Sequence, residues 1–343
     1  MPLVRLSNIF DMINIRISTL MFAAISTAFA LFAASQTHAQ DILITKAKTP
    51  GETTKRKGTI ESWQGSTIRM LIGSREREFD TADVIDVQTN WPDGFLEAKR
   101  LLSQRKFGKA FQAFKNADTK EERKWVRHEI AGGIIQCLQA TGNHAQAAEE
   151  FISVVESDPQ TRLFHLIPLQ WVPVSEGAPS PKAVSEWLTS KNSAVRLLGA
   201  SWQKTTAKRS ALDVLQALLQ DENRFVVHLA TAQLWDPLSA KPSDLKRWTR
   251  QLNAMPQSLR AGPYIALADA QSRNKLYDPA AVNFMRIPVL YATNRSLSAP
   301  ALYSAGRVLQ NAGRQDEAKR IWNELRRDYP ASSWAERVSA AGK

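Results

Sequence analysis

Few side chains in this sequence have the types and spacing that catalysis or metal binding requires. The histidines beyond residue 40 are far apart and are His128, His144, His165 and His228. The H-E-x-x-H and C-x-x-C spacings of metal and redox sites do not occur in the sequence. Asp83 and Asp86 are close enough to act as a carboxylate pair, but their place on the last short strand expected in this region favours roles at a turn and a sheet edge. These residues therefore predict neither a metal site nor an acid–base pair.

The motifs of phosphate binding and of nucleophilic catalysis are also absent from the sequence. There is no G-x-x-x-x-G-K-[ST], no G-x-G-x-x-G and no G-x-S-x-G. Gly132 and Gly133 lie within an apolar helical stretch, where they favour close packing of helices rather than phosphate contact. Cys137 is the single cysteine, which excludes an intramolecular disulfide, and its apolar neighbours favour a small buried side chain. We therefore expect no enzyme, no metal and no cofactor.

Residues 1–40 have the pattern of a signal peptide. Arg5 and Arg16 precede an apolar run over residues 20–34, and small residues precede Gln40. We expect cleavage near Ala39 and export to the periplasm or cell envelope of a bacterium. An uncleaved anchor beginning near Ile17 is the alternative, because the run can be extended to a membrane-spanning length.

The charge is strongly basic, with 45 Lys and Arg against 33 Asp and Glu and a formal net charge of +12. Nucleic acid is the first partner that such a charge suggests, but an exported protein rarely meets it, so no nucleic-acid partner is expected. Anionic envelope polymers, lipid headgroups and acidic proteins fit the compartment better. Solvated polar faces of helices are the alternative explanation of the charge.

Residues 41–90 show the alternation of β-strands. Short β-branched runs such as residues 58–63, 66–71 and 84–87 are separated by turns at Gly65 and Gly73. The pattern predicts a small β-meander. It resembles an SH3-like or Sm-like barrel.

From residue 91 onwards the apolar period becomes helical, and pairs of helices recur. Ala110 and Ala147 lie 37 residues apart, and Ala280 and Ala318 lie 38 apart. In residues 299–338 a small-residue helix containing Leu302 and Gly306 is followed by a turn at Gly313. A second helix with Ala318, Trp322 and Leu325 then ends at Pro330. We expect Gly306 to face Ala318 across this pair.

Residues 91–160 and 261–343 resemble tetratricopeptide repeats, although Gly94, Glu97 and Ile135 depart from the family pattern. Residues 161–260 have a different sequence pattern, with similar segments at 193–200 and 224–231 that lie 31 residues apart. They resemble HEAT-type repeats, with a generic helical bundle as the alternative. Residues 167–181 are rich in proline and predict a linker or an exposed loop. The expected fold is mainly α: an α-solenoid of such helix pairs preceded by a small β-barrel-like domain.

The tetratricopeptide resemblance implies a non-catalytic scaffold that binds a protein or peptide on the inner face of its first helices. Amide and guanidinium groups on that face can bond an extended backbone or a carboxylate. When the inner groove of the family is transferred to the matching helices of this chain, it includes Lys99, Gln136, Gln139, Arg273, Tyr303, Arg307, Gln310 and Asn311. Ordinary solvated faces of amphipathic helices are the alternative explanation for these residues. The second functional hypothesis is a binder of anionic envelope polymers or lipid headgroups through the basic surfaces.

Overall fold

The computed structural model describes residues 40–47, 49, 51–174, 176–204 and 208–341. The predicted signal peptide and its cleavage site at Ala39 lie outside these residues, so export stays a prediction. Among the described residues, no helix combines the length and apolar character needed to cross a membrane. The chain divides into two compact units. Residues 60–70 and 76–82 belong to the same unit as the helices from residue 91 onwards, and the rest of the β region forms the other unit.

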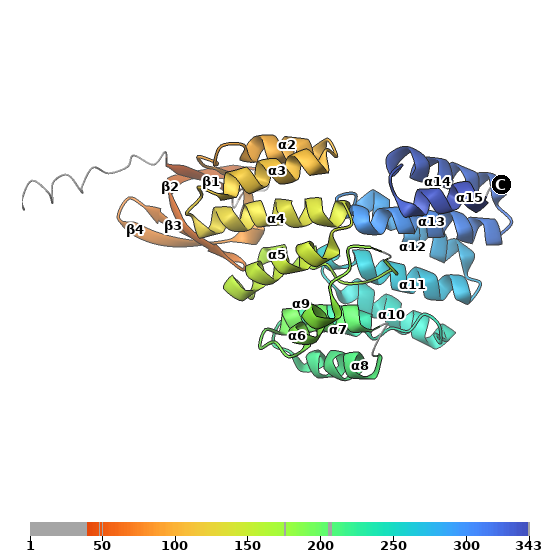
Figure 1. The fold of residues 1–343 in the computed structure, drawn as a ribbon. Coiled ribbons are helices and arrows are strands. Elements are labelled where there is room, and N and C mark those ends of the chain that lie inside the picture. The colour runs from red at the N-terminus through yellow and green to blue at the C-terminus, as the bar shows by residue number, and fades with distance from the viewer. Residues whose placement is uncertain (1–39, 48, 50, 175, 205–207, 342–343) are drawn as a thin grey trace, which may run out of the picture. The chain divides into compact units, whose positions relative to one another are not determined.

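Five strands form the β region (Figure 1), and they are β1 (Asp41–Lys46), β2 (Thr53–Gln64), β3 (Thr67–Ile72), β4 (Arg75–Asp80) and β5 (Val84–Gln88). Their order in the sheet is β4-β3-β2-β1-β5, and β1 pairs antiparallel with both β2 and β5. Gly65 and Gly73 have positive φ angles of 52° and 61° in two-residue turns, a conformation that glycine adopts without a steric cost. Strands β1 to β4 therefore follow one another as in the predicted meander, whereas β5 pairs with β1 instead of β4. Closure into a barrel stays a prediction, because β4 and β5 lie at opposite ends of this strand order.

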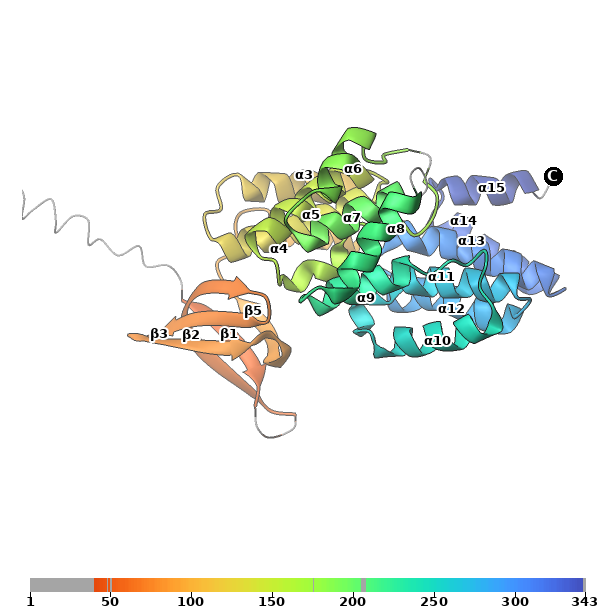
Figure 2. The same cartoon turned by 90° about the horizontal axis from the view of Figure 1, so that it is seen from below.

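Helices form most of the rest of the described chain. The first helices are α2 (Phe95–Ser103), α3 (Phe107–Asp118), α4 (Lys124–Ala140) and α5 (His144–Ser157). The central helices are α6 (Pro181–Leu188), α7 (Ser193–Gln203), α8 (Lys208–Ala217), α9 (Arg224–Gln233) and α10 (Pro242–Ala254). The last are α11 (Ala261–Arg273), α12 (Tyr277–Leu290), α13 (Arg295–Asn311), α14 (Gln315–Asp328) and α15 (Ser333–Ala341). Consecutive helices pack against each other (Figure 2), which confirms a mainly α, solenoid-like fold after an N-terminal β region.

Four helix pairs share one turn geometry, which explains the alanine spacing seen in the sequence. The turn residue of each pair has a positive φ, and these residues are Arg105, Gly142, Lys275 and Gly313. After each turn residue, the next amide donates to a carbonyl five positions before itself, as Asn143 does to Leu138 at 2.9 Å. Five positions beyond the turn residues stand Ala110, Ala147, Ala280 and Ala318, each fully buried. The four pairs therefore have a common register.

The indole ring of Trp322 lies against Gly306, and the expectation that Ala318 faces Gly306 stays a prediction. A Cβ added at Gly306 would lie 2.1 Å from the indole nitrogen of Trp322. The indole N–H of Trp322 also donates to the Tyr303 carbonyl at 3.2 Å. The absence of a side chain at Gly306 thus makes room for a large ring, and Ala318 is part of the buried core.

The repeat of 31 residues in the central region corresponds to two equivalent helix starts. Asn192 and Asn223 precede α7 and α9, and their side-chain oxygens accept from the amides of Ala194 and Phe225, each at 2.9 Å. Each side-chain amide also donates to a carbonyl of an earlier segment, to Val155 from Asn192 and to Pro159 from Asn223. The N-cap asparagine is therefore the structural basis of the repeat, and its assignment to the HEAT type stays a prediction.

Candidate functional site

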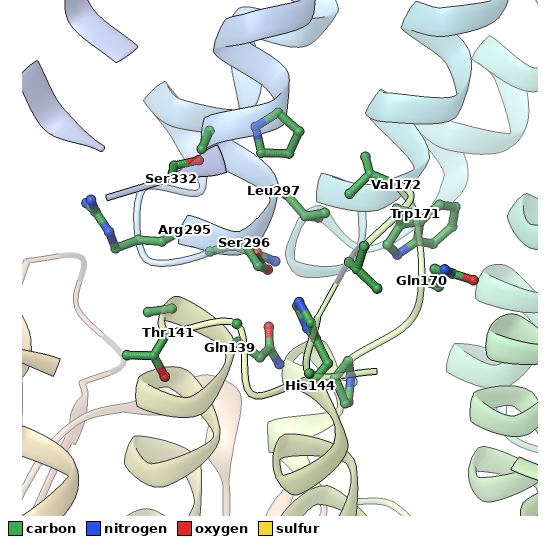
Figure 3. A pocket seen from close by; sticks show the side chains of 18 of the residues that line it. Gln139, Thr141, His144, Gln170, Trp171, Val172, Arg295, Ser296, Leu297 and Ser332 are labelled. Carbon is green, nitrogen blue, oxygen red and sulfur yellow. Dashed lines mark hydrogen bonds between the residues drawn. The ribbon is translucent and has the colours of Figure 1, made fainter. Parts of the chain in front are cut away.

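A cavity of about 890 Å³ lies among the helices of the second unit. Figure 3 shows its main walls. Gln139, Thr141 and His144 come from the end of α4, the turn after it and the start of α5, and Arg295, Ser296 and Leu297 come from the start of α13. Ser332, in the turn between α14 and α15, lies nearby. A third wall is residues 167–174, which we call the crossing segment.

Only part of the proline-rich stretch is the exposed loop that its prolines suggested: Glu176, Gly177 and Ala178 are exposed, whereas most of the crossing segment is buried or half-buried. The Pro168 carbonyl accepts from the indole N–H of Trp202 in α7 at 2.9 Å. The Gln170 amide donates to Ser201 Oγ in α7 at 2.9 Å, and the Gln170 carbonyl accepts from Gln233 Nε2 in α9 at 3.3 Å. Local composition indicated a loop because proline cannot continue a helix. Long-range hydrogen bonds to helices distant in the sequence anchor this segment, so that Pro168 and Leu169 are buried, while Pro173 is exposed.

Trp171 fixes the middle of the crossing segment. Its ring lies against Gly262, near the start of α11, where an added Cβ would be 2.1 Å from the indole nitrogen. The same side chain packs against both of the large hydrophobic clusters of the helical unit. Gly262 therefore forms a slot for a flat aromatic ring, because any side chain at this position would occupy the place of the indole.

Arg295 lies at the opposite wall, between two aromatic rings. Its guanidinium is 5.3 Å from the centre of the Phe107 ring and 4.0 Å from that of Tyr329. Nη2 donates to the Asp328 carbonyl at 2.5 Å, and burial lowers the pKa of this guanidinium from its usual value. Nη1 is buried without a hydrogen-bond partner among the described residues. Arg295 thus contacts both the start of α3 and the end of α14.

A histidine of the cavity and the single cysteine of the chain have shifted pKa values. Burial lowers the pKa of His144, so its imidazole is neutral near pH 7. Cys137 is buried, and the loss of solvation raises the pKa of its thiol to about 12, which keeps it protonated. Within the described ranges, no cluster of three or more His, Cys, Asp or Glu could hold a metal ion.

The structure brings one of the eight residues predicted for the groove to the cavity. Gln139 lines it and donates to the Leu166 carbonyl at 2.5 Å. Tyr303 is half-buried, with its ring 5.2 Å from that of Trp334, so it supports the last repeat. The others stand elsewhere on the helices: Lys99 on α2, Gln136 on α4, Arg273 on α11 beside Asp269, and Arg307, Gln310 and Asn311 on the exposed face of α13.

Sequence reasoning missed the residues that hold the crossing segment. Ser201, Trp202 and Gln233 occupy helices that were assigned to the central repeats, and no local pattern separates them from ordinary helix residues. Trp171 had a weak signal, since it is an aromatic residue between two prolines in an uncharged stretch. Arg295 had none, because its aromatic neighbours Phe107 and Tyr329 are distant from it in the sequence.

A family model described as tetratricopeptide repeat matches residues 300–332, which cover most of α13, the Gly313 turn and α14. No curated protein and no solved structure matches the chain significantly. The family match and the shared register of four helix pairs support a helical-repeat protein of the tetratricopeptide type. Such repeats generally mediate protein–protein interaction and scaffolding.

Proposed function

We propose that this chain is an exported, non-catalytic scaffold that binds a protein partner by holding an extended segment of it in the central cavity. The observation that carries the proposal is the crossing segment itself. Side chains from α7 and α9 bond to its backbone at Pro168 and Gln170, so this surface is already suited to an extended chain. The crossing segment forms one wall of the cavity, so a partner segment that took its place would also line the cavity.

Export forms part of the proposal and depends on residues 1–40. Arg5 and Arg16, the apolar run after them and the small residues before Gln40 support removal of a signal peptide near Ala39. The partner would then be a protein of the periplasm or the cell envelope.

The second hypothesis, binding of anionic envelope polymers or lipid headgroups, is supported by the net charge of +12. Several exposed arginines are paired with carboxylates, which reduces the charge that they offer to an anionic surface. Arg314 bonds to Asp278 at 2.7 Å and to Glu317 at 2.5 Å, and Arg69 lies 2.5 Å from Glu76. Protein binding at the cavity is therefore the hypothesis that the geometry favours.

The test is a capture experiment on envelope extract with two matched variants. Ala331 and Ala292 are both exposed alanines in turns, but Ala331 lines the cavity and Ala292 does not. Ala331→Trp should fill part of the cavity and abolish capture of the partner, whereas Ala292→Trp should capture it as the wild type does. Equal capture by both variants would contradict binding in the cavity.

Two further comparisons distinguish the remaining surfaces. If Arg307→Ala weakens capture and Ala331→Trp does not, the partner binds the exposed face of α13 that the sequence predicted. If binding falls steeply with salt and is lost after charge reversal of Arg326 and Arg327, the anionic-surface hypothesis is correct.

A further inference from the structure

The crossing segment shows which kind of peptide this surface recognises. We propose that residues 167–174 occupy a peptide-binding site, and that the partner is an extended, uncharged, proline-containing peptide that places an aromatic ring over Gly262. This inference deepens the proposed function and rests on it, because it names the class of partner for the same cavity-facing surface.

The contacts to the crossing segment are directed mainly at backbone groups, which every peptide possesses. Ser201 and Gln233 are nearly fully buried, with exposed fractions of 1% and 2%. Buried polar side chains cost free energy unless they are hydrogen-bonded, and the backbone of Gln170 provides bonds to both. These two side chains are therefore placed for a backbone that lies across α7 and α9, and not for one particular side chain.

The conformation of the crossing segment lowers the cost of binding. Pro168 and Pro173 each fix one backbone dihedral and favour extended geometry in the residue before them. A peptide with this composition is largely extended before it binds, so it loses little conformational entropy in the site. Residues 167–174 also contain no charged side chain, so burying them does not require a counter-ion.

Side-chain selectivity comes from two anchors. Leu169 is buried among the residues of one core cluster, and Trp171 lies in the slot formed by Gly262. Aromatic anchors in well-packed pockets usually supply most of the binding energy at an interface. The preferred partner sequence therefore has an apolar residue two positions before an aromatic residue, with a proline on each side of the pair.

The crossing segment is tethered at both ends, by the short helix Arg162–Leu166 before it and by α6 after it. A tethered ligand competes at a high effective concentration, so a free peptide should bind weakly to the intact chain. Removing the segment from the site should reveal strong binding of the same sequence added in solution.

The experiment uses the chain from Gln40 onwards with residues 167–174 replaced by a Gly-Ser linker of equal length. A fluorescent synthetic peptide of residues 166–174 is titrated and followed by fluorescence anisotropy. It should bind the linker variant at least about tenfold more tightly than the wild type. A Trp171→Ala peptide should lose about tenfold or more in affinity, as expected for an aromatic anchor.

A third protein tests the slot itself. In the linker variant Trp171 is absent, so the methyl group that Gly262→Ala adds does not meet the Trp171 ring. The same methyl group would occupy the place of the peptide's indole ring and should therefore prevent the peptide from binding. The proposal would be overturned if the Trp171→Ala peptide bound as tightly as the unsubstituted peptide, or if Gly262→Ala left the affinity of the linker variant unchanged. It would also be overturned if the peptide did not bind a linker variant that circular dichroism shows to be folded.

If the linker variant does not fold, Trp171→Ala in the otherwise intact chain replaces it. Its slot is empty while the rest of the segment remains, so the peptide should bind it more tightly than the wild type, and no gain would reject the proposal. Capture of a partner that is sensitive to Ala331→Trp, together with no peptide binding, would reject this inference alone. Peptide binding without such capture would leave the peptide site in place and reject the scaffold function.

Discussion

The indole ring of Trp171 lies against the backbone of Gly262, although the two residues belong to segments far apart in the sequence. Trp171 belongs to a stretch without regular secondary structure, and Gly262 to the first turn of α11. Because Trp171 also packs against both large hydrophobic clusters, this contact connects the central helices to the last repeats.

Gly262→Ala should destabilise the protein by about 1–3 kcal/mol, because the new methyl group would overlap the Trp171 ring and force a shift. Urea unfolding measures the change. Gly108→Ala is the matched control: Gly108 is an exposed glycine within α3, and an added Cβ there has no neighbour within 4 Å. This control should raise stability by about 0.5–1 kcal/mol, as expected for alanine in a helix. A neutral Gly262→Ala would show that Trp171 does not occupy this slot.

In the last repeat, Trp322→Ala should lower the free energy of unfolding by about 3 kcal/mol or less. The loss is smaller than for a core tryptophan because the ring is half-buried. Ala318→Leu should cost about 1–3 kcal/mol, since Ala318 has no exposed surface and the core must expand. Thermal unfolding followed by circular dichroism tests both variants. A negligible effect of Ala318→Leu would mean that the register of this helix pair is wrong.

Arg295→Met should destabilise the protein by about 1–3 kcal/mol through the loss of stacking on Tyr329 and of the hydrogen bond to the Asp328 carbonyl. Arg295→Lys should restore only part of this loss, because an ammonium group lacks the planar fork that stacks between two rings. Arg307→Met, on the exposed face of the same helix, should stay within about 0.5 kcal/mol of the wild type. Full rescue by lysine would show that charge alone matters at this position.

Stability should fall as the pH is lowered from about 7.5 to 5. Burial is the main cause that lowers the pKa values of His128, His144 and His228 below the usual 6.5. The unfolded chain therefore binds more protons than the folded chain below pH 6.5, so the stabilisation is complete above this pH and is lost as the pH falls towards the folded pKa values. His144→Gln should reduce this slope in urea unfolding. A slope that stays the same in this variant would contradict the lowered pKa of His144.

Amino-terminal sequencing of the protein isolated from its native cell should begin near Gln40 or Asp41. The basic residues, apolar run and small residues of positions 1–40 motivate this cleavage. An intact Met1 or Met12 on a membrane-bound protein would instead indicate an anchor.

The sequence alone determined the elements that depend on local order. Alternating β-branched residues and the turns at Gly65 and Gly73 predicted the strands, and the spacing of Ala110, Ala147, Ala280 and Ala318 predicted paired helices in a common register. These features follow from the periods of strand and helix and from the backbone freedom of glycine, which act over a few residues.

The tertiary structure alone decided what the crossing segment does. Pro168 and Pro173 show by themselves that the chain cannot be helical there, but not whether it lies on the surface or in the interior. That choice depends on Ser201, Gln233 and Gly262, whose contacts with residues 167–174 are distant in sequence. A buried serine or glutamine follows the same helical period as a solvated one, so its partner becomes visible only when the helices are packed together.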